Sequence, residues 1–387
     1  MQTEPEVTVV IPCLNEADTL AVCIQKALKS FATAGIAGEV LVADNGSTDG
    51  SPEIATRLGA RVVAVSNKGY GHALRGGIQA ARGKFIVMGD ADDSYDFLET
   101  PRFVAKLREG FDLVQGCRLP AGGGRVMPGA MPVTHRWIGN PMFSCMARRM
   151  FSAPIHDIYC GLRGFTKALY ERLELRCTGM EFATEMIIKA SLQKARIAEI
   201  PITLHVDGRK SHTPHLKTVR DGWRTLRFFL LLSPEWLFFI PGSVLILLGL
   251  VGYSVALPGL RLGRITFDAH TLLFSSLAVL LGYQSALFAI FAKTFGINEG
   301  ILPEDSRFRH FFQIMNLERG LALGTVSLLV GLVLLAETVR QWVGAGFGPL
   351  DYSHTMRWVI PGVTLVALGF QTILSSFFVS MLGMKHR

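Results

Sequence analysis

Charged residues are scarce in the last third of the chain, and acidic residues are in the minority overall. The 387 residues include 31 Asp and Glu against 39 Lys and Arg, which gives a formal net charge of +8. From about residue 236 onward, long stretches carry almost no charge of either sign. These stretches argue against a wholly soluble protein, in which charged and apolar residues are interspersed along the chain.

Signatures of several other protein classes are also missing. The cysteines form no CxxC pair, so reduced, buried thiols facing the cytosol are expected, and the histidines have no metal-ligand spacing. No aromatic-rich RNA-binding pattern or helix-turn-helix accompanies the basic residues, so nucleic acid is not an expected partner. The polar N-terminus predicts no signal peptide. The residues concerned are Cys13, Cys23, Cys117, Cys145, Cys160 and Cys177, with His72, His135, His156 and His205.

Four long apolar segments occupy the end of the chain, at 236–257, 272–292, 321–336 and 359–382. A membrane-spanning helix needs about 20 predominantly apolar residues. The third segment reaches that length only by taking in residues 337–343 or part of the preceding turn. We therefore predict an all-α transmembrane domain of four spans over residues 236–387, with the lipid bilayer as a partner.

A basic segment lies directly before the first apolar stretch. Residues 208–235 are predicted to form a juxtamembrane region with an amphipathic helix at 216–232, whose cations meet lipid headgroups. The apolar side chains expected to dip into the membrane boundary are Trp223, Leu226, Phe229 and Leu230. The basic residues are Arg209, Lys210, Lys217, Arg220, Arg224 and Arg227.

The basic residues are distributed unequally between the two sides of the predicted spans. Four spans put both termini on one side, together with the juxtamembrane cations and Lys293, Arg307, Arg309, Arg319, Lys385 and Arg387. The other side holds only Arg261, Arg264, Arg340 and Arg357. The positive-inside rule then predicts a multi-pass protein of the cell or inner membrane, with residues 1–207 and both termini in the cytoplasm.

Residues 1–207 alternate short apolar runs with helix-like segments. Strands are predicted at 7–12, 39–43, 61–66, 84–89 and 112–116, with helices near 17–34, 50–59, 71–82 and 98–109. Unbroken apolar runs are typical of parallel strands covered on both faces. The sequence therefore predicts an α/β domain with a mostly parallel sheet. After a loop-rich segment at 120–165, a further helix at 180–194 and a strand near 197–206 are expected.

Polar side chains follow each of the five predicted strands. Ligands of parallel sheets bind beyond the carboxyl ends of the strands, so these residues are expected to gather at one edge. They are Asn15 and Glu16, Asp44 and Asn45, Asn67 and Lys68, Asp90 and Asp92, and Arg118.

The segment K-F-I-V-M-G-D-A-D-D at 84–93 runs from a buried strand into three carboxylates. Adjacent carboxylates repel one another unless they are solvated or bound to a cation. Mg²⁺ and Mn²⁺ prefer such oxygens and commonly bridge to substrate phosphates. The pattern indicates a metal–diphosphate site, but a group of Asp residues capping a helix would have the same pattern.

Two further segments allow both a structural and a functional interpretation. In A-D-N-G-S-T-D-G at 43–50, Asp44 could accept hydrogen bonds from a base or ribose, or simply form a turn. In V-V-I-P-C-L-N-E at 9–16, Asn15 and Glu16 open a helix and could cap it.

Taken together, the three segments resemble family 2 glycosyltransferases with the GT-A fold. There the first strand reads V-x-I-P-x-x-N-E, the second ends in a D-(D/N)-x-S-x-D turn and the fourth ends in D-x-D. The chain is also similar to the polyprenyl- or dolichol-phosphate branch of that family, which includes dolichol phosphate mannose synthases. The similar segments are 67–83, 116–118, 157–165, 182–190, 197–201 and, loosely, 208–216.

The sequence departs from that branch in two places. Mannose synthases often read D-A-D-L-Q with the Gln near the metal, whereas Asp93 and Ser94 follow here, which leaves the third ligand open. The R-x-x-x-S-K-L segment matches at Arg209 and Ser211 and is then stretched by four residues.

The resemblance implies an inverting, metal-dependent transfer of a GDP- or UDP-linked sugar to a polyprenyl phosphate, for cell-envelope glycoconjugate synthesis, with Mg²⁺ or Mn²⁺ as cofactor. The implied catalytic residues are Asp90, Asp92 and Asp157, and the implied metal ligands are Asp90, Asp92 and Ser94. The implied nucleotide-sugar site is Pro12, Asn15, Glu16, Asp44, Asn45, Lys68, Gly69, Ala91 and Arg209. The implied lipid-phosphate site is Arg118, Arg136, Arg148 and Ser211.

Alternatives stay open for some of these residues and for the function. Asp157 is also compatible with a buried structural carboxylate, and Arg136 and Arg148 with simple headgroup contacts. A lipid or saccharide hydroxyl as acceptor would need a base, for which Asp93 is available. A non-catalytic membrane scaffold is disfavoured by the intact acidic pair. A processive synthase is excluded, because neither Arg-Trp pair has a Gln three positions earlier. A homo-oligomer is compatible with the resemblance.

Overall fold

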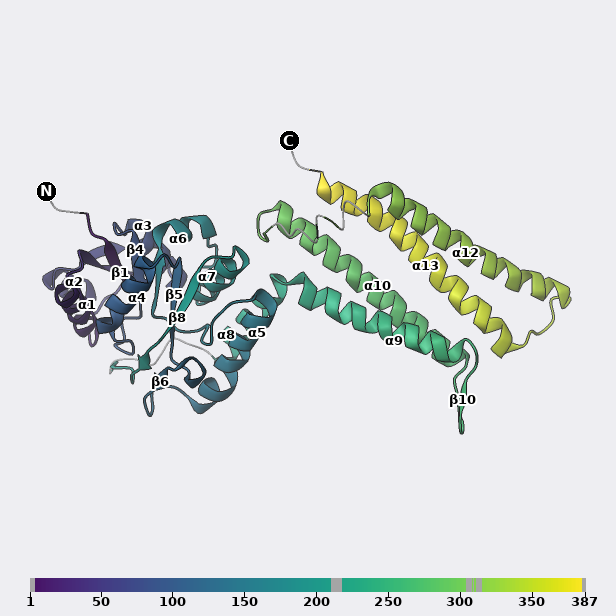
Figure 1. Cartoon of the computed structure of the whole chain (residues 1–387), viewed down its shortest axis with the longest axis horizontal. Helices are drawn as coiled ribbons and strands as arrows, with labels where there is room; N and C mark the ends of the chain where they lie inside the picture. Colours follow the sequence, from purple (N-terminus) through teal and green to yellow (C-terminus); the bar gives the residue numbers. More distant parts are fainter. Residues whose placement is uncertain (1–3, 210–217, 304–307, 309, 311–314, 385–387) are drawn as a thin grey trace. The chain divides into compact units, whose positions relative to one another are not determined.

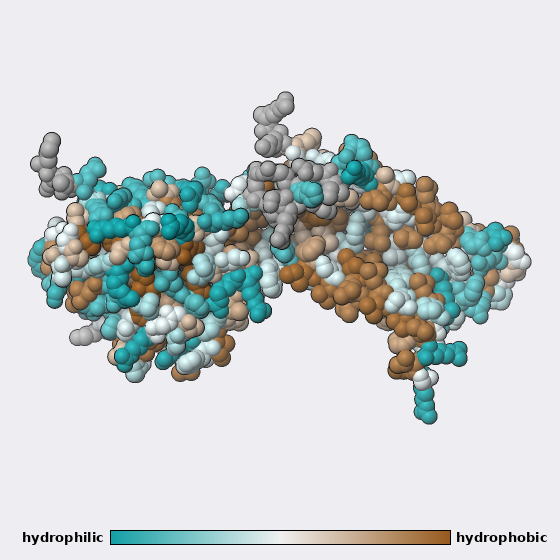
Figure 2. Space-filling view, in the orientation of Figure 1, coloured by the Kyte–Doolittle hydropathy of each residue, from teal (hydrophilic) through white to brown (hydrophobic). Residues whose placement is uncertain are grey.

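The computed structural model describes residues 4–209, 218–303, 308, 310 and 315–384. The chain divides into two compact units, Met1–Phe229 and Leu230–Arg387 (Figure 1). Hydrophilic residues cover much of the visible face of the first unit, whereas hydrophobic residues gather over the helices of the second (Figure 2).

The first unit is built on a seven-stranded sheet of order β3-β2-β1-β4-β7-β5-β8. Neighbouring strands are parallel except for β7, which runs antiparallel between β4 and β5. The expected mostly parallel α/β domain is confirmed, but β7 was not predicted, because R-G-F-T offers no apolar run. The strands are β1 (Val7–Cys13), β2 (Gly38–Asp44), β3 (Arg61–Ala64), β4 (Phe85–Met88), β5 (Leu113–Cys117), β7 (Arg163–Thr166) and β8 (Ile197–Pro201).

Helices cover both faces of this sheet. On one face, Val7, Val9 and Ile11 of β1 share a core with α1 (Leu20–Ala34) and α4 (Thr100–Arg108). On the other, α3 (Tyr70–Ala80) approaches so closely that a Cβ on Gly77 would lie 2.6 Å from Val10 Cγ1. Burial on both faces explains the unbroken apolar strands. The unit also contains α2 (Ser51–Arg57), α5 (Asn140–Phe151), α6 (Lys167–Leu173), α7 (Glu181–Leu192) and the parallel pair β6 (Arg125–Val126) and β9 (Thr203–Leu204).

The predicted amphipathic helix is found as α8 (Thr218–Leu231). Its Trp223 is 62 % exposed, as expected of a residue at a membrane boundary. Phe229, however, is fully buried against Phe143 and Phe151, with ring centroids 6.0 and 5.4 Å away. The prediction that Phe229 dips into the membrane is therefore wrong, because this ring completes an aromatic cluster inside the first unit.

Among the residues that the structure describes, the second unit contains four helices that are long and apolar enough to cross a membrane. The third, expected to be the shortest, extends over 28 residues and includes Glu337 and Arg340, which pair at 2.7 Å along the helix. The helices are η4 (Glu235–Phe239) continuing into α9 (Ile240–Ala256), then α10 (Ala269–Asn298), α12 (Leu317–Gly344) and α13 (Tyr352–Gly383). A short hairpin, β10 (Arg261–Leu262) and β11 (Ile265–Thr266), joins α9 to α10.

Small residues and hydroxyl groups hold these helices together. A Cβ on Gly324 of α12 would lie 2.9 Å from the backbone oxygen of Gly369 on α13, so the two backbones are in close contact. Thr364 Oγ1 of α13 lies 2.8 Å from the Tyr253 hydroxyl of α9 and 2.6 Å from Ser276 Oγ of α10. These contacts link all four helices.

Candidate active site

The carboxyl ends of β1, β2 and β4 bring the expected polar residues to one edge of the sheet. In the parallel register of β1 and β2, Pro12 pairs with Ala43 and Cys13 with Asp44. Asp90 comes two residues after the end of β4, which pairs with the other side of β1. The loops that follow these three strands therefore begin at neighbouring positions on one edge of the sheet.

Asp90 is enclosed from two sides. The Tyr70 hydroxyl donates a hydrogen bond to Asp90 Oδ1 at 3.0 Å. A Cβ on Gly161 would lie 2.6 Å from Asp90 Oδ2, so the site leaves no room for a side chain there. Desolvation by the surrounding protein, together with the charge of Asp92, raises the pKa of Asp90 to about 6. A nearby cation would favour the charged form of this carboxylate.

Asp92 directs its two oxygens to different partners. Oδ1 accepts hydrogen bonds from the backbone N–H and the hydroxyl of Ser94, at 3.0 and 2.6 Å. Oδ2 lies 3.4 Å from Arg209 Nη1. Ser94 thus donates its hydroxyl hydrogen to Asp92, while the lone pairs of its oxygen remain. The next residue, Asp93, has a φ of 59° and pairs with Lys26 at 2.7 Å.

Arg209 contacts three acidic residues, two of which are distant from it in the sequence. Its Nε and Nη2 each donate to the Glu16 carboxylate at 2.8 Å, and its Nη1 lies 2.8 Å from Asp207 Oδ2. Burial opposes its charge, but the hydrogen bonds to Glu16 and the charges of Asp92 and Asp207 outweigh burial and raise its pKa. The structure therefore brings Glu16 and Arg209, two residues of the implied nucleotide-sugar site, together with Asp92, an implied metal ligand.

Asn15 and Asp44 shape the loop that follows β2. Asp44 accepts hydrogen bonds from the backbone N–H groups of Gly46 and Ser47, at 3.0 and 3.2 Å. Asn15 has a left-handed backbone with φ 59°, and its side-chain oxygen accepts from the Thr48 N–H at 2.8 Å. Asp44 thus makes the turn-forming contacts that the sequence allowed for it. Asn15 holds the same loop and does not cap the following helix, which begins at Leu20 with Thr19 as its N-cap residue.

Asn45 connects the end of β2 to the loop before α3. Its side-chain oxygen accepts from the Gly69 N–H at 2.8 Å, and its backbone oxygen accepts from Lys68 Nζ at 2.6 Å. Lys68 is exposed, so its ammonium group is accessible to an anionic ligand. Ala91 is buried, and its backbone oxygen accepts from the Cys23 thiol at 3.4 Å.

Arg118 and Asp157 form a buried ion pair with two parallel contacts. Arg118 Nε and Nη2 donate to Asp157 Oδ2 and Oδ1 at 2.7 and 2.9 Å. The Tyr95 hydroxyl accepts from Arg118 Nη1 at 3.2 Å and from the Gly161 N–H at 2.8 Å, so the pair is connected to the loop beside Asp90. The sequence assigned the two residues to different sets, one catalytic and one for lipid phosphate, and the structure brings them together.

The remaining lipid-phosphate candidates lie elsewhere in the unit. Arg148 of α5 donates to the Ile155 backbone oxygen at 3.0 Å. Arg136, on the single turn η3 (His135–Gly139), lies over the Trp137 ring at 5.1 Å from its centroid. Trp137 is 60 % exposed, which agrees with the headgroup-contact interpretation of Arg136. Ser211 lies outside the described residues.

The donor set fits a hard divalent cation that substrate phosphates help to bind. Within the part of the chain that the structure describes, no group of three His, Cys, Asp or Glu residues could hold a metal ion. Mg²⁺ usually takes only one or two carboxylates, with waters and substrate phosphates as its other ligands. Asp90 and Asp92 meet this requirement, and a cation would relieve the repulsion between them.

Three polar residues of the described site, Tyr70, Tyr95 and Arg163, were not identified from the sequence. Tyr70 and Tyr95 contact Asp90 and Arg118, as described above. Arg163 of β7 is fully buried, and its Nη2 donates to the Cys160 backbone oxygen at 2.7 Å. Burial lowers the pKa of Arg163. Tyr70 and Arg163 lie within segments 67–83 and 157–165, but their partners became visible only in the folded chain.

A mostly parallel α/β domain with paired carboxylates at its edge, followed by four membrane-competent helices, defines a membrane-associated glycosyltransferase. Comparison with known families agrees: residues 8–173 match glycosyl transferase family 2, and residues 290–383 match the glycosyltransferase family 2 C-terminal transmembrane region. The chain belongs to glycosyltransferase family 2.

Relatives of the chain include prenyl-phosphate sugar transferases. It is 36 % identical over 381 residues to the low-salt glycan biosynthesis hexosyltransferase Agl6 of Haloferax volcanii, covering 98 % of this chain and 89 % of that one. It is 30 % identical over 294 residues to the undecaprenyl-phosphate 4-deoxy-4-formamido-L-arabinose transferase of Klebsiella pneumoniae, covering 72 % and 84 %. It is 33 % identical over 165 residues to the dolichyl-phosphate hexose transferase of Haloferax volcanii, covering 42 % and 68 %.

Proposed function

We propose that this protein transfers a sugar from a GDP- or UDP-linked donor to a polyprenyl phosphate at a membrane, with inversion of the anomeric centre. The observation that carries the proposal is the Asp90–Asp92 pair at the carboxyl edge of the sheet, in a chain with four membrane-competent helices. The names of two relatives, a dolichyl-phosphate and an undecaprenyl-phosphate transferase, support this class of acceptor. The product would be a lipid-linked monosaccharide for cell-envelope glycoconjugates.

The donor diphosphate is assigned to the acidic pair and its neighbours. Asp90 and Asp92 would hold Mg²⁺ or Mn²⁺, which when bound neutralises charge on the leaving diphosphate. Ser94 orients Asp92 through its two hydrogen bonds, and Arg209 adds positive charge beside it. Lys68 offers an exposed cation. We assign the binding of the nucleotide to Pro12, Asn15, Glu16, Asp44, Asn45, Gly69 and Ala91.

The acceptor needs positioning more than a strong base. The second pKa of a phosphate monoester is about 6, so the group is largely ionised near neutral pH and attacks as an anion. In this proposal, the Arg118–Asp157 pair fixes the loop beside Asp90 through Tyr95. Arg136, Arg148 and Ser211 are assigned to the acceptor phosphate or to neighbouring headgroups.

Transfer to a hydroxyl acceptor is less well supported. It would need a general base within reach of the acceptor hydroxyl. The candidate, Asp93, is paired with Lys26 at 2.7 Å, so one of its carboxylate oxygens is already engaged within the protein.

The test is a screen of the purified full chain with GDP- and UDP-linked sugars, Mg²⁺ or Mn²⁺, and polyprenyl phosphate, read out as lipid-linked sugar. Reactions with polyprenol and diacylglycerol serve as controls, because they offer a hydroxyl in place of the phosphate. Transfer to the phosphate alone is expected. Transfer only to a hydroxyl would contradict the proposed acceptor, and no transfer by folded protein would favour a scaffold.

We also propose that residues 1–207 form the catalytic domain, 208–235 the juxtamembrane region and 236–387 the membrane domain. The excess of basic residues on one side of the helices supports a cytoplasmic catalytic domain and cytoplasmic termini. Protease treatment of sealed, inside-out membrane vesicles should remove the catalytic domain, whereas right-side-out vesicles should protect it. Protection in the inside-out vesicles would reverse the proposed orientation.

A further inference from the structure

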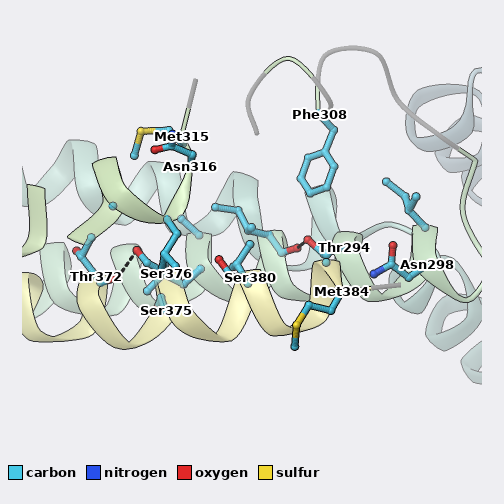
Figure 3. Close-up of a pocket in the computed structure, with 18 of the residues that line it drawn as sticks. Thr294, Asn298, Phe308, Met315, Asn316, Thr372, Ser375, Ser376, Ser380 and Met384 are labelled. Carbon is cyan, nitrogen blue, oxygen red and sulfur yellow. Dashed lines mark hydrogen bonds between the residues drawn. The ribbon is translucent and has the colours of Figure 1, made fainter. Parts of the chain in front are cut away.

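A cavity of about 710 Å³ lies between α10, α12 and α13 in the second unit (Figure 3). Its volume falls within the range of roughly 300–1,000 Å³ that is typical of ligand sites. Along α10, the lining residues recur every three or four positions, from Tyr283 through Leu287, Ile290 and Thr294 to Asn298. At about 1.5 Å per residue, this stripe is about 22 Å long. The cavity is therefore a long groove on one face of α10.

Several of the hydroxyl groups that line the groove are already bonded within the helices. Thr294, Thr372 and Ser376 each donate to the backbone oxygen four residues earlier, at 2.8, 2.6 and 2.8 Å. The Tyr283 hydroxyl lies 2.6 Å from Thr372 Oγ1, which joins α10 to α13. Such groups have little need of a polar ligand. The groove therefore suits a hydrocarbon better than a sugar or a nucleotide.

The two ends of the groove differ. The hydroxyl contact between Tyr283 and Thr372 bounds one end. At the other end, Asn298 closes α10 and donates to the Leu382 backbone oxygen, and Asn316 caps α12 by accepting from a backbone N–H at 3.0 Å. This polar end lies toward the beginning of α9, because Ser285, in the second half of α10, donates to the Phe238 backbone oxygen at 2.8 Å. The polar end thus lies at the end of the bundle where the chain enters α9.

We propose that this groove binds the isoprene units next to the phosphate of the polyprenyl phosphate acceptor, an inference that rests on the function proposed above. A single long groove fits one hydrocarbon chain, whereas a phospholipid carries two. Small residues on the groove side of α13 leave room for the methyl branches of an isoprenoid: Ser375, Ser376 and Ser380. Figure 3 shows Ser376 and Ser380 facing the same space as Thr294 of α10.

Photo-crosslinking tests the groove directly. The full chain is placed in phosphatidylcholine nanodiscs with undecaprenyl phosphate that carries a diazirine near its phosphate end. We expect the crosslinked peptides to come from the groove faces of α10 and α13. Unlabelled undecaprenyl phosphate should compete, whereas phosphatidic acid and inorganic phosphate should not. Labelling spread over the lipid-facing sides of all four helices, or equal competition by phosphatidic acid, would overturn the inference.

A pair of matched substitutions tests whether the crosslinking comes from the groove. Ser380→Phe fills the groove, whereas Ser254→Phe makes the same change on an exposed position of α9. Overfilling a packed site should lower groove labelling about tenfold for Ser380→Phe and leave it within about twofold for Ser254→Phe. Ser375→Leu is a smaller filling change for use if Ser380→Phe does not fold, and it should also reduce labelling. Equal labelling of the groove variants and the control would contradict the proposal that the groove binds the isoprene units.

The crosslinking readout requires no sugar transfer, so the two proposals can fail separately. Groove labelling by a protein that transfers no sugar to any polyprenyl phosphate would overturn the proposed function and leave the lipid site standing. Sugar transfer to polyprenyl phosphate by a protein whose groove is never labelled would overturn the groove alone.

Discussion

Arg118 holds Asp157 through two parallel contacts of 2.7 and 2.9 Å, at a point where the carboxylate is fully buried. Removing one partner of a buried pair leaves an uncompensated charge, which costs about 3–5 kcal/mol. We expect Arg118→Ala to destabilise the first unit by about this amount. Arg118→Lys should also destabilise it, because an ammonium group cannot make both contacts. Thermal unfolding of the detergent-solubilised full chain measures the effect.

The control for this prediction is Arg149→Ala, since Arg149 is an exposed residue of α5. Its effect on the free energy of unfolding should stay within about 0.5 kcal/mol, as is usual for surface substitutions. A comparable loss of stability in both variants would mean that the buried ion pair contributes no more to the free energy of unfolding than an exposed arginine does.

Asp92 is predicted to be required for transfer. Asp92→Asn keeps the shape of the side chain but weakens binding of a divalent cation. Because a bound metal ion supplies several kcal/mol of charge stabilisation, transfer should fall about 100-fold or more. Mn²⁺ binding in the presence of a nucleoside diphosphate, followed by calorimetry, should weaken in parallel. Asp96→Asn is the matched control, because Asp96 caps a helical turn and Asn caps equally well. Unchanged transfer by Asp92→Asn would remove Asp92 from the mechanism.

Gly161 is predicted to tolerate no side chain. The added Cβ of Gly161→Ala would lie 2.6 Å from Asp90 Oδ2 and 3.2 Å from the Tyr95 hydroxyl. Displacement of this carboxylate by even about 1 Å should lower transfer about 100-fold. Gly222→Ala serves as control, because no atom lies within 4 Å of the added Cβ. Wild-type transfer by Gly161→Ala would mean that Oδ2 takes no part in binding the cation.

Glu39 is predicted to give part of the acid sensitivity of the fold. Burial opposes its charge, but the Arg82 N–H, the Thr8 hydroxyl and Arg61 outweigh burial and lower its pKa. A lowered pKa means that this stabilisation is present above the ordinary value of 4.5 and is lost as the pH falls through the lowered value. Glu39→Gln should therefore cost about 1–2 kcal/mol at neutral pH, and the difference from wild type should shrink in acid. Melting curves across pH test this, with exposed Glu53→Gln as control. A constant difference at every pH would contradict the linkage.

The sheet and the four apolar helices could be predicted because their signals are local. The unbroken apolar runs of β1, β2 and β4 reflect burial on both faces, and each helix in the second unit is apolar over most of its length. The third helix was underestimated because Glu337 interrupts its apolar run. In the structure Arg340, one turn later along the same helix, pairs with Glu337 and offsets that charge.

The contacts that complete the site are long-range, and the sequence could not show them. Arg118 and Asp157 lie in separate motifs, and only the fold shows that each is the other's partner. In the same way, β7 has no apolar pattern of its own. Phe229 lies on the apolar face of a predicted amphipathic helix, but the structure buries it within the protein. Sequence patterns report which face of an element is apolar, but not which distant group will cover it.

The position of β7 has a consequence for the order in which the chain folds. During synthesis, β1, β2, β3 and β4 can pair as soon as residue 88 has emerged, because their neighbours in the sheet are all early in the chain. In contrast, β5 has no partner strand until residues 163–166 arrive and insert between it and β4. Such late, non-local pairing slows folding and leaves strand edges exposed. A ribosome-bound chain that stops before residue 163 should therefore hold a four-stranded half-sheet that is accessible to chaperones.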